Sequence, residues 1–290
     1  MNYLLLQLRK ITKIAYKYRG LARIAEGIRK YYSHYQKNIL VDDFDNSLAF
    51  YCALDEHMGS QIFWKGFYSG DQLNLLDRIL NPDMIFLDVG ANHGEFTVFA
   101  AKRLTEGHVI AFEPVSIFFE KLERNVKQNG FNNVTLINQG LGDSDTHITI
   151  YSRDERFEDG TKNEGLHSIY ITKSCSRAFE TIKIICLDDF IKSHQIPKVD
   201  VIKLDIEGAE LAALRGAKET ITRFRPIILI EVNEETCQAA GYPPRALLDY
   251  LSEIGYRFDL IIRNGITRSI IPDELDKFQN IICLPQIKSI

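Results

Sequence analysis

Residues 86–97 constrain the fold of this chain more than any other part of the sequence. The apolar run 84–89 is typical of a buried parallel strand, and residues 95–104 carry apolar side chains at helical spacing. Gly90 and Gly94 therefore bracket a turn from a strand into a helix, where glycine permits a positive φ or a close approach of backbone to a ligand. This segment predicts one strand-turn-helix unit of an open α/β sheet.

The glycine loop differs from a dinucleotide-binding loop, G-x-G-x-x-G, because Asn92 stands at the second glycine position and the last glycine comes one residue early. A diphosphate favours a helix N-terminus without nearby negative charge, whereas Asp88 and Glu95 flank this turn. S-adenosylmethionine has no phosphate and carries an ammonium and a sulfonium group. The acidic, glycine-walled loop therefore favours S-adenosylmethionine over a nicotinamide dinucleotide.

Acidic residues also follow the other predicted parallel strands. The strand at residues 108–112 ends at Glu113, 25 residues after Asp88, near the interval at which nucleotide-binding α/β folds place a ribose-binding acid. Strands near residues 199–204 and 226–230 end at Asp205 and Glu231. Since ligands of open α/β sheets bind at the carboxyl edge, we expect these acids to lie around one site.

Taken together, the motifs resemble the FkbM family of S-adenosylmethionine-dependent methyltransferases over residues 62–256. The resemblance rests on segments 88–94, 112–114, 141–143, 202–210, 225–226 and Glu231, in this order. It implies an α/β class I methyltransferase fold, Rossmann-like, with a mostly parallel seven-stranded sheet, helices on both faces and an N-terminal helical extension. Predicted antiparallel strands at 256–262 and 280–284 match the sixth and seventh strands by which this fold differs from that of dehydrogenases.

The resemblance also implies a set of site residues, each at a matching position of this sequence. It implies cofactor contacts around the methionine part, the ribose and the adenine, and acids near the transferred methyl group. These are Asp88, Gly90, Asn92 and Gly94 for the methionine part, Glu113 for the ribose, Gly142 and Asp143 for the adenine, and Lys203, Asp205, Glu207 and Glu231 near the methyl group, with Ala91, Thr97, Pro114 and Asp205 counted among the cofactor contacts as well.

Methyl transfer to a hydroxyl requires alignment of the acceptor oxygen with the methyl carbon and sulfur, and a base within about 3 Å of the hydroxyl. Asp205 is our first candidate, because clustering with Glu207 and Glu231 would raise its proton affinity; the alternative is that it caps the following helix. His167 is the second candidate. Lys203 either contacts the substrate or pairs with Glu231. We assign no metal, although three acids so close could also bind Mg²⁺.

The first 38 residues differ in charge from the rest of the chain. They contain nine Lys or Arg and one acid, a net charge of +8, which leaves −12 for the remainder. We divide the chain into this basic amphipathic extension (1–38), a lead-in segment packing on the core (39–83) and a methyltransferase domain (84–290). A heptad-like apolar seam is predicted in the extension, comprising Leu4, Leu8, Ile11, Ala15, Tyr18, Ala22 and Ala25.

Three interpretations of the extension stay open. It packs on its own domain or forms a homo-oligomer, it contacts an anionic membrane surface, or it binds nucleic acid. We expect no nucleic acid, because the remainder of the chain is acidic and would repel phosphates. Two further segments are candidate pocket walls. These are the aromatic residues Trp64, Phe67 and Tyr68, which could equally pack a helix on the sheet, and the polar loop 152–165 with His167 and Ser168 at its exit, which could equally be a solvated hairpin.

Composition fits a soluble globular protein, with 45% hydrophobic and 26% charged residues. Five single cysteines without C-x-x-C spacing indicate neither a disulfide framework nor a zinc site, so we expect a cytoplasmic protein, with membrane-surface association as an open alternative. The predicted function is O-methylation of a saccharide or glycoconjugate hydroxyl. The alternatives are an NAD-dependent sugar oxidoreductase or epimerase, and a non-catalytic membrane or partner adaptor that keeps the fold.

Overall fold

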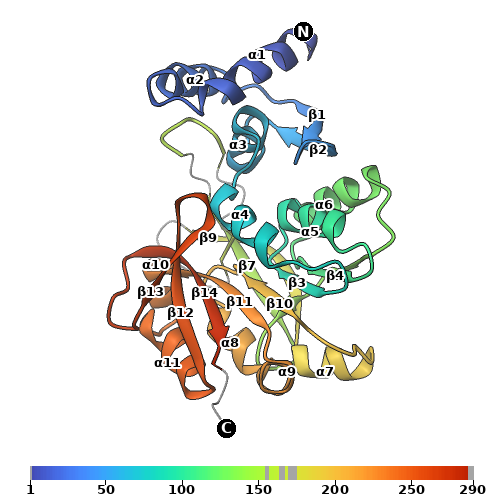
Figure 1. Ribbon diagram of the computed structural model, residues 1–290, viewed down its shortest axis with the longest axis vertical. Helices are drawn as coiled ribbons and strands as arrows, with labels where there is room; N and C mark the ends of the chain where they lie inside the picture. The colour runs from blue at the N-terminus through green and yellow to red at the C-terminus, as the bar shows by residue number, and fades with distance from the viewer. Residues whose placement is uncertain (1, 154–156, 163–166, 169–174, 287–290) are drawn as a thin grey trace.

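The computed structural model describes residues 2–153, 157–162, 167–168 and 175–286. Among these residues, an eight-stranded sheet forms the centre of the molecule (Figure 1). Its spatial order is β13 (Ile266–Ile270), β12 (Tyr256–Ile262), β14 (Phe278–Pro285), β11 (Ile227–Asn233), β10 (Val201–Leu204), β3 (Ile85–Val89), β4 (His108–Phe112) and β5 (Val134–Ile137).

The strand order and directions are those of the class I methyltransferase fold. Strands β5, β4, β3, β10 and β11 run parallel, and β14 lies antiparallel between β11 and β12. The predicted antiparallel pairing of residues 256–262 with 280–284 is confirmed by the β12 and β14 register, in which Leu260 faces Ile281. The sheet has one strand more than the predicted seven, because β13 adds antiparallel to the outer edge of β12.

Helices cover both faces of this sheet. Adjacent residues of each parallel strand point to opposite faces, so each strand contributes apolar side chains to both helical layers. Phe86 of β3 packs with helices α4 (Gly70–Ile79), α5 (Glu95–Arg103) and α6 (Ser116–Gln128). Leu87, its neighbour, packs on the other side. The helices there are α7 (Leu187–Ser193), α8 (Glu210–Arg215), α9 (Lys218–Phe224), α10 (Glu234–Ala239) and α11 (Arg245–Glu253). A separate 3₁₀ turn, η1 (Arg263–Gly265), connects β12 to β13.

A smaller sheet extends from the carboxyl edge of the central one. Its order is β6 (Gly140–Leu141), β9 (Cys175–Ile185), β7 (Thr146–Arg153) and β8 (His167–Ser168). The antiparallel β7 and β9 are long, so they carry apolar side chains such as Ile150 and Ile184 away from the central sheet and over its ligand-binding edge.

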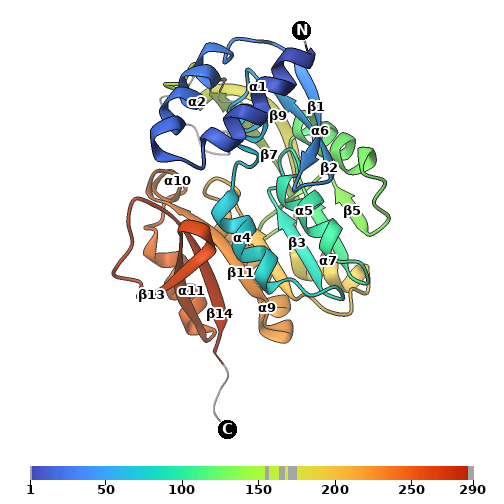
Figure 2. The same ribbon diagram turned by 45° about the horizontal axis from the view of Figure 1, so that its top comes forward.

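The N-terminal residues form helices α1 (Asn2–Ala15) and α2 (Arg19–Tyr31), a hairpin of β1 (Asn38–Phe44) and β2 (Leu48–Ala53), and α3 (His57–Lys65). Figures 1 and 2 show α1 and α2 together at one end of the molecule, beyond α3. No described helix is both long enough and apolar enough to span a bilayer.

The predicted apolar seam of the extension is wrong. The chain turns between α1 and α2, and the seam residues Leu4, Ile11 and Tyr18 are exposed. The buried face of α1 instead includes Arg9, which pairs with Asp43, and Thr12, whose hydroxyl bonds to backbone carbonyls, so polar anchoring rather than an apolar seam orients the helix.

Candidate active site

A cavity of about 630 Å³ lies at the carboxyl ends of β3, β4, β10 and β11. The second sheet and the start of α3 form its other walls. Eleven of the residues predicted for the site line it, namely Gly90, Ala91, Asn92, Glu113, Pro114, Gly142, Asp143, Lys203, Asp205, Glu207 and Glu231. The structure therefore brings together residues from five separate segments of the sequence at one cavity.

The glycine loop is built on close backbone contacts. The N–H groups of Gly90 and Ala91 both donate to the carbonyl of Phe112 at 3.0 Å, which holds the loop against the end of β4. Gly90 has a φ of +78°, and a Cβ placed on it would lie 2.0 Å from the backbone oxygen of Asp205. Only glycine fits this position, because the loop and the turn after β10 touch through their main chains.

Glu113 is buried under the loop with only 4% of its surface exposed. One carboxylate oxygen accepts the N–H of Asn92 at 2.8 Å and the other accepts that of Val115 at 2.9 Å. Burial raises the pKa of Glu113 to about 7 in spite of these bonds. Each oxygen retains a second lone pair, so the carboxylate can also accept hydrogen bonds from a hydroxylated ligand in the cavity.

Three predicted cofactor residues lie behind the loop rather than along the cavity. Gly94 directly precedes α5 with a φ of +89°, and a Cβ there would lie 2.6 Å from a methyl group of Leu122. Thr97 donates to Asp88 at 2.6 Å, and Asp88 is fully buried. These residues position the loop in the structure, and their direct contact with a cofactor stays a prediction.

Lys203 joins the loop to the acidic side of the cavity. Its ammonium donates to the carbonyl of Gly90 at 2.7 Å and lies 3.4 Å from Asp205 and 3.7 Å from Asp88. Burial alone would lower the pKa of Lys203, but Asp205 and Asp88 hold it above its ordinary value. Its ion pairs are thus with Asp88 and Asp205 rather than with Glu231.

Asp205, Glu207 and Glu231 form a compact group of acids. Each offers a carboxylate oxygen within 4.8 Å of the others. Burial, with repulsion from Asp205 and Glu207, raises the pKa of Glu231 to about 10, so Glu231 is protonated at neutral pH. This arrangement supplies a hydrogen-bond donor and two acidic acceptors on the same side of the cavity.

The turn after β10 explains how these acids are held. Glu207 has a φ of +54°, and the N–H groups of Ile206 and Gly208 donate to the buried carboxylate of Glu210. The alternative that Asp205 caps the following helix is wrong, because α8 begins only at Glu210. The side chain of Asp205 is left to Lys203 and to the cavity.

Two features of the cavity wall were missed from the sequence. Glu95, fully buried at the start of α5, accepts the N–H groups of Tyr68 and Ser69, which places Tyr68 beside the acids. Burial raises the pKa of Glu95 to about 7. Glu95 stood inside the loop motif, but its partners lie 27 residues earlier in the chain, and no local pattern indicates that contact.

The second missed feature is His57 at the start of α3. Its Nδ1 lies 3.1 Å from a carboxylate oxygen of Asp159, which also pairs with Arg29 of α2 at 2.7 Å. Thr161 and Arg29 outweigh the effect of burial and lower the pKa of Asp159 to about 2. The imidazole stacks on Phe157 with ring centroids 3.9 Å apart. Phe157, in the described part of the predicted polar loop, thus lines the cavity.

Some predicted residues lie elsewhere. Trp64 is fully buried against Tyr32, away from the cavity, so its interpretation as part of the pocket wall is wrong and it packs in the core instead. Phe67 packs against Phe44, and only Tyr68 of the three aromatic residues reaches the cavity. The backbone of His167 belongs to β8, but its side chain lies outside the described residues, so its role as a base stays a prediction.

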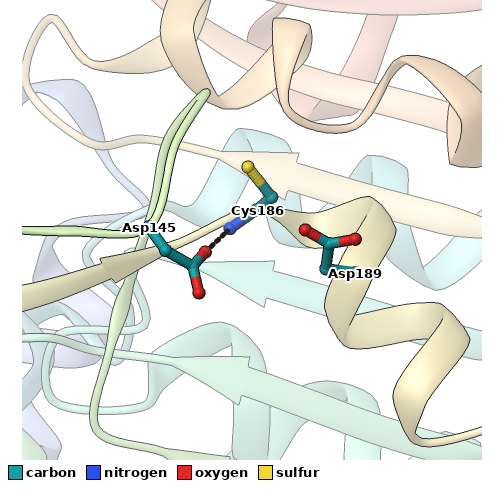
Figure 3. A group of neighbouring side chains, drawn as sticks. All are labelled: Asp145, Cys186 and Asp189. Atoms are coloured by element: carbon teal, nitrogen blue, oxygen red, sulfur yellow. Dashed lines mark hydrogen bonds between the residues drawn. The ribbon is translucent and has the colours of Figure 1, made fainter.

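Outside the cavity, Asp145, Cys186 and Asp189 lie close together (Figure 3). Asp145 accepts the N–H of Cys186 at 3.0 Å, and Asp189 lies in the first turn of α7. Acidic side chains favour the N-terminal turn of a helix. These contacts connect the start of β7 to the start of α7, and they account for the group without a ligand.

Comparison with known proteins agrees with this geometry. Residues 88–258, more than half of the chain, match the Methyltransferase FkbM domain. The hexuronic acid methyltransferase AglP of Haloferax volcanii is 29% identical over 184 residues, covering 63% of this chain and 67% of AglP. The 2-O-methyltransferase NoeI of Sinorhizobium fredii is 23% identical over 210 residues, covering 66% of this chain and 83% of NoeI.

A third relative is much longer than the region that it shares with this chain. AMB antimetabolite synthetase AmbE of Pseudomonas aeruginosa is 24% identical over 234 residues, which cover 71% of this chain and only 11% of AmbE. The strand order, the residues at the cavity and the family match all agree. The chain therefore belongs to the FkbM methyltransferase family and has the class I methyltransferase fold.

Proposed function

We propose that this methyltransferase uses S-adenosylmethionine to methylate a hydroxyl group of a saccharide or glycoconjugate. The observation that carries the proposal is the position of the acidic group Asp205, Glu207 and Glu231 at the same cavity as the glycine loop and Glu113. The glycine loop and Glu113 would bind the methyl donor, and the acidic group would interact with the acceptor hydroxyl.

The cavity fits a cationic nucleoside. Gly90 presents bare backbone to the cavity, packed on the turn after β10, and Glu113 has free lone pairs for ribose hydroxyls. Among the described residues, Lys203 is the only lysine or arginine on the wall, and Asp88, Asp205 and the Gly90 carbonyl already surround its charge. A diphosphate would find carboxylates in this space and no uncompensated cation, which disfavours the NAD-dependent alternative.

The acidic group suits removal of a proton from an acceptor. When bound, S-adenosylmethionine supplies an electrophilic methyl group. Asp205 is our proposed base, since its side chain lies on the cavity beside Lys203 and is accessible to an acceptor hydroxyl. Glu231, protonated at neutral pH, can donate a hydrogen bond to the acceptor. Tyr68 beside them offers an aromatic face of the kind on which sugar rings stack.

The saccharide class is supported by two kinds of observation. AglP and NoeI are described as a hexuronic acid methyltransferase and a 2-O-methyltransferase. On the acidic side of the cavity, Asn233 and Asn280 add amide groups that can bind further hydroxyls. Incubation with labelled S-adenosylmethionine and a panel of uronic acids, neutral hexoses and non-sugar alcohols tests the proposal. We expect methyl incorporation into a sugar, and incorporation into non-sugar alcohols alone would contradict it.

A further inference from the structure

Helices α1 and α2 and the turn between them expose a group of large apolar side chains. Sixteen large apolar side chains are exposed among the described residues, and eight of these fall in the first 31 positions, so the exposure is concentrated. They are Tyr3, Leu4, Ile11, Ile14, Tyr18, Leu21, Ile24 and Tyr31, from 48% to 80% exposed. In α1, Tyr3, Leu4, Ile11 and Ile14 lie on one face of the helix, with seven residues from Leu4 to Ile11 and three from Ile11 to Ile14.

The opposite face of the two helices is already occupied by the chain itself. Leu5 is buried, Arg9 and Lys13 pair with Asp43, and Arg29 pairs with Asp159. The helices are therefore held on the molecule by their buried face. Their apolar outer face is exposed and is available to a partner.

Cationic side chains flank the apolar surface. Lys10, Lys17, Arg23 and Lys30 are exposed, and the structure gives them no ion pair within the residues it describes. Residues 1–38 carry a net charge of +8 and the rest of the chain −12, so net positive charge is concentrated in the segment that contains these helices. A second copy would place like charges face to face, and a nucleic acid would leave the apolar stripe in water. An anionic bilayer accommodates both the apolar side chains and the flanking cations.

We propose that α1 and α2 dock this protein on an anionic membrane surface. The apolar side chains enter the boundary between headgroups and acyl chains, and the flanking cations meet the lipid phosphates. The two helices form one end of the molecule (Figures 1 and 2), so a flat surface reaches them without contacting the central sheet. The proposal rests on this surface alone and is independent of the proposed methyl transfer.

Flotation with large unilamellar vesicles tests the proposal. One set contains phosphatidylcholine alone, and the other contains phosphatidylcholine and phosphatidylglycerol at about 7:3. We expect the full chain to float with the anionic vesicles only, and 0.5 M NaCl to weaken the binding. The apolar variant is Leu4→Ser, Ile11→Ser and Ile24→Ser, and its control is Ile117→Ser, Ile266→Ser and Ile271→Ser, three residues that are also exposed.

The charge variant is Lys10→Gln, Lys17→Gln, Arg23→Gln and Lys30→Gln, with Lys192, Lys218, Arg223 and Arg263 changed to Gln as its control, all of them exposed. We expect both test variants to lower the partition coefficient at least ~10-fold, and both controls to leave it within about twofold. Circular dichroism and titration with S-adenosylhomocysteine establish that each variant is folded.

Three outcomes would overturn the proposal. The first is that the wild-type chain stays with the unbound protein at every lipid composition. The second is that the apolar variant and its control float equally well. The third comes from light scattering without vesicles, where a wild-type dimer that the apolar variant converts to a monomer would assign the surface to a second copy.

Discussion

Replacement of Gly90 by alanine tests how the cofactor loop is built. A Cβ at this position would lie 2.0 Å from the backbone oxygen of Asp205 and 2.9 Å from a methyl group of Ile206. Because real Cβ contacts stay beyond 3.0 Å, the loop or the turn after β10 must move by at least 1 Å. The backbone there has a φ of +78°, which an alanine also adopts at a cost.

Gly130 provides a matched control. Its φ is +65°, and a Cβ there would meet nothing within 4 Å. Gly130→Ala therefore lowers the free energy of unfolding only by the cost of holding alanine in the left-handed conformation, about 1–2 kcal/mol. Gly90→Ala adds an overpacking cost of about 1–3 kcal/mol. At about 2 °C per kcal/mol for a chain of this size, we expect Tm to fall by ~2–4 °C for the control and ~4–10 °C for Gly90→Ala.

The two variants should also differ in cofactor binding. A shift of 1 Å moves the Gly90 carbonyl away from Lys203 and the Asn92 N–H away from Glu113. Isothermal titration calorimetry should therefore show at least ~10-fold weaker binding of S-adenosylhomocysteine to Gly90→Ala and unchanged binding to Gly130→Ala. Equal melting temperatures and equal affinities in the two variants would refute the account of the loop.

Three further substitutions separate the roles of the acids. Asp205→Asn should keep S-adenosylhomocysteine binding and lower kcat by ~10²–10⁴-fold in a methyl-incorporation assay, and undiminished turnover would remove Asp205 from the mechanism. Glu113→Ala should weaken binding of the same ligand by about 1.5–3 kcal/mol in calorimetry while circular dichroism stays native; unchanged affinity contradicts a ribose contact. Since the pKa of Glu231 is raised from 4.5 to about 10, its ionisation in the unfolded chain destabilises the fold increasingly as pH rises from about 4.5 towards 10. Glu231→Gln should therefore match the wild-type Tm near pH 4.5 and exceed it at pH 8, and a difference that does not change with pH would argue against the raised pKa.

The central sheet could be predicted because its signals are local. Each parallel strand is a short, largely apolar run that a polar residue or a glycine follows, and buried strands of this kind tolerate little else. The predicted strand at 108–112 has the bounds of β4 in the structure. The two-helix form of residues 2–31 was not predictable in the same way. Arg9 and Thr12 are buried there through contacts with Asp43 and the Trp64 carbonyl, more than 30 residues later.

The residues of the candidate site also differ in whether their placement depends on local sequence or on distant contacts. Residues that directly follow a strand, such as Glu113 and Asp205, were predicted because strand ends meet at one edge of the sheet. His57 and Glu95 were missed because their placement depends on partners far away in the sequence, Asp159 and the Tyr68 backbone. Trp64 was misplaced for the converse reason, since an aromatic residue near a pocket segment gives no indication of the face on which it lies.

Calorimetric titration of the wild-type chain with S-adenosylhomocysteine and, separately, with NAD⁺ tests the central claim most directly. The acidic surroundings of the glycine loop predict binding of S-adenosylhomocysteine with one site per chain and no heat of binding for NAD⁺. Binding of NAD⁺ in place of S-adenosylhomocysteine, or of neither ligand, would contradict the assignment of this cavity to a methyl donor.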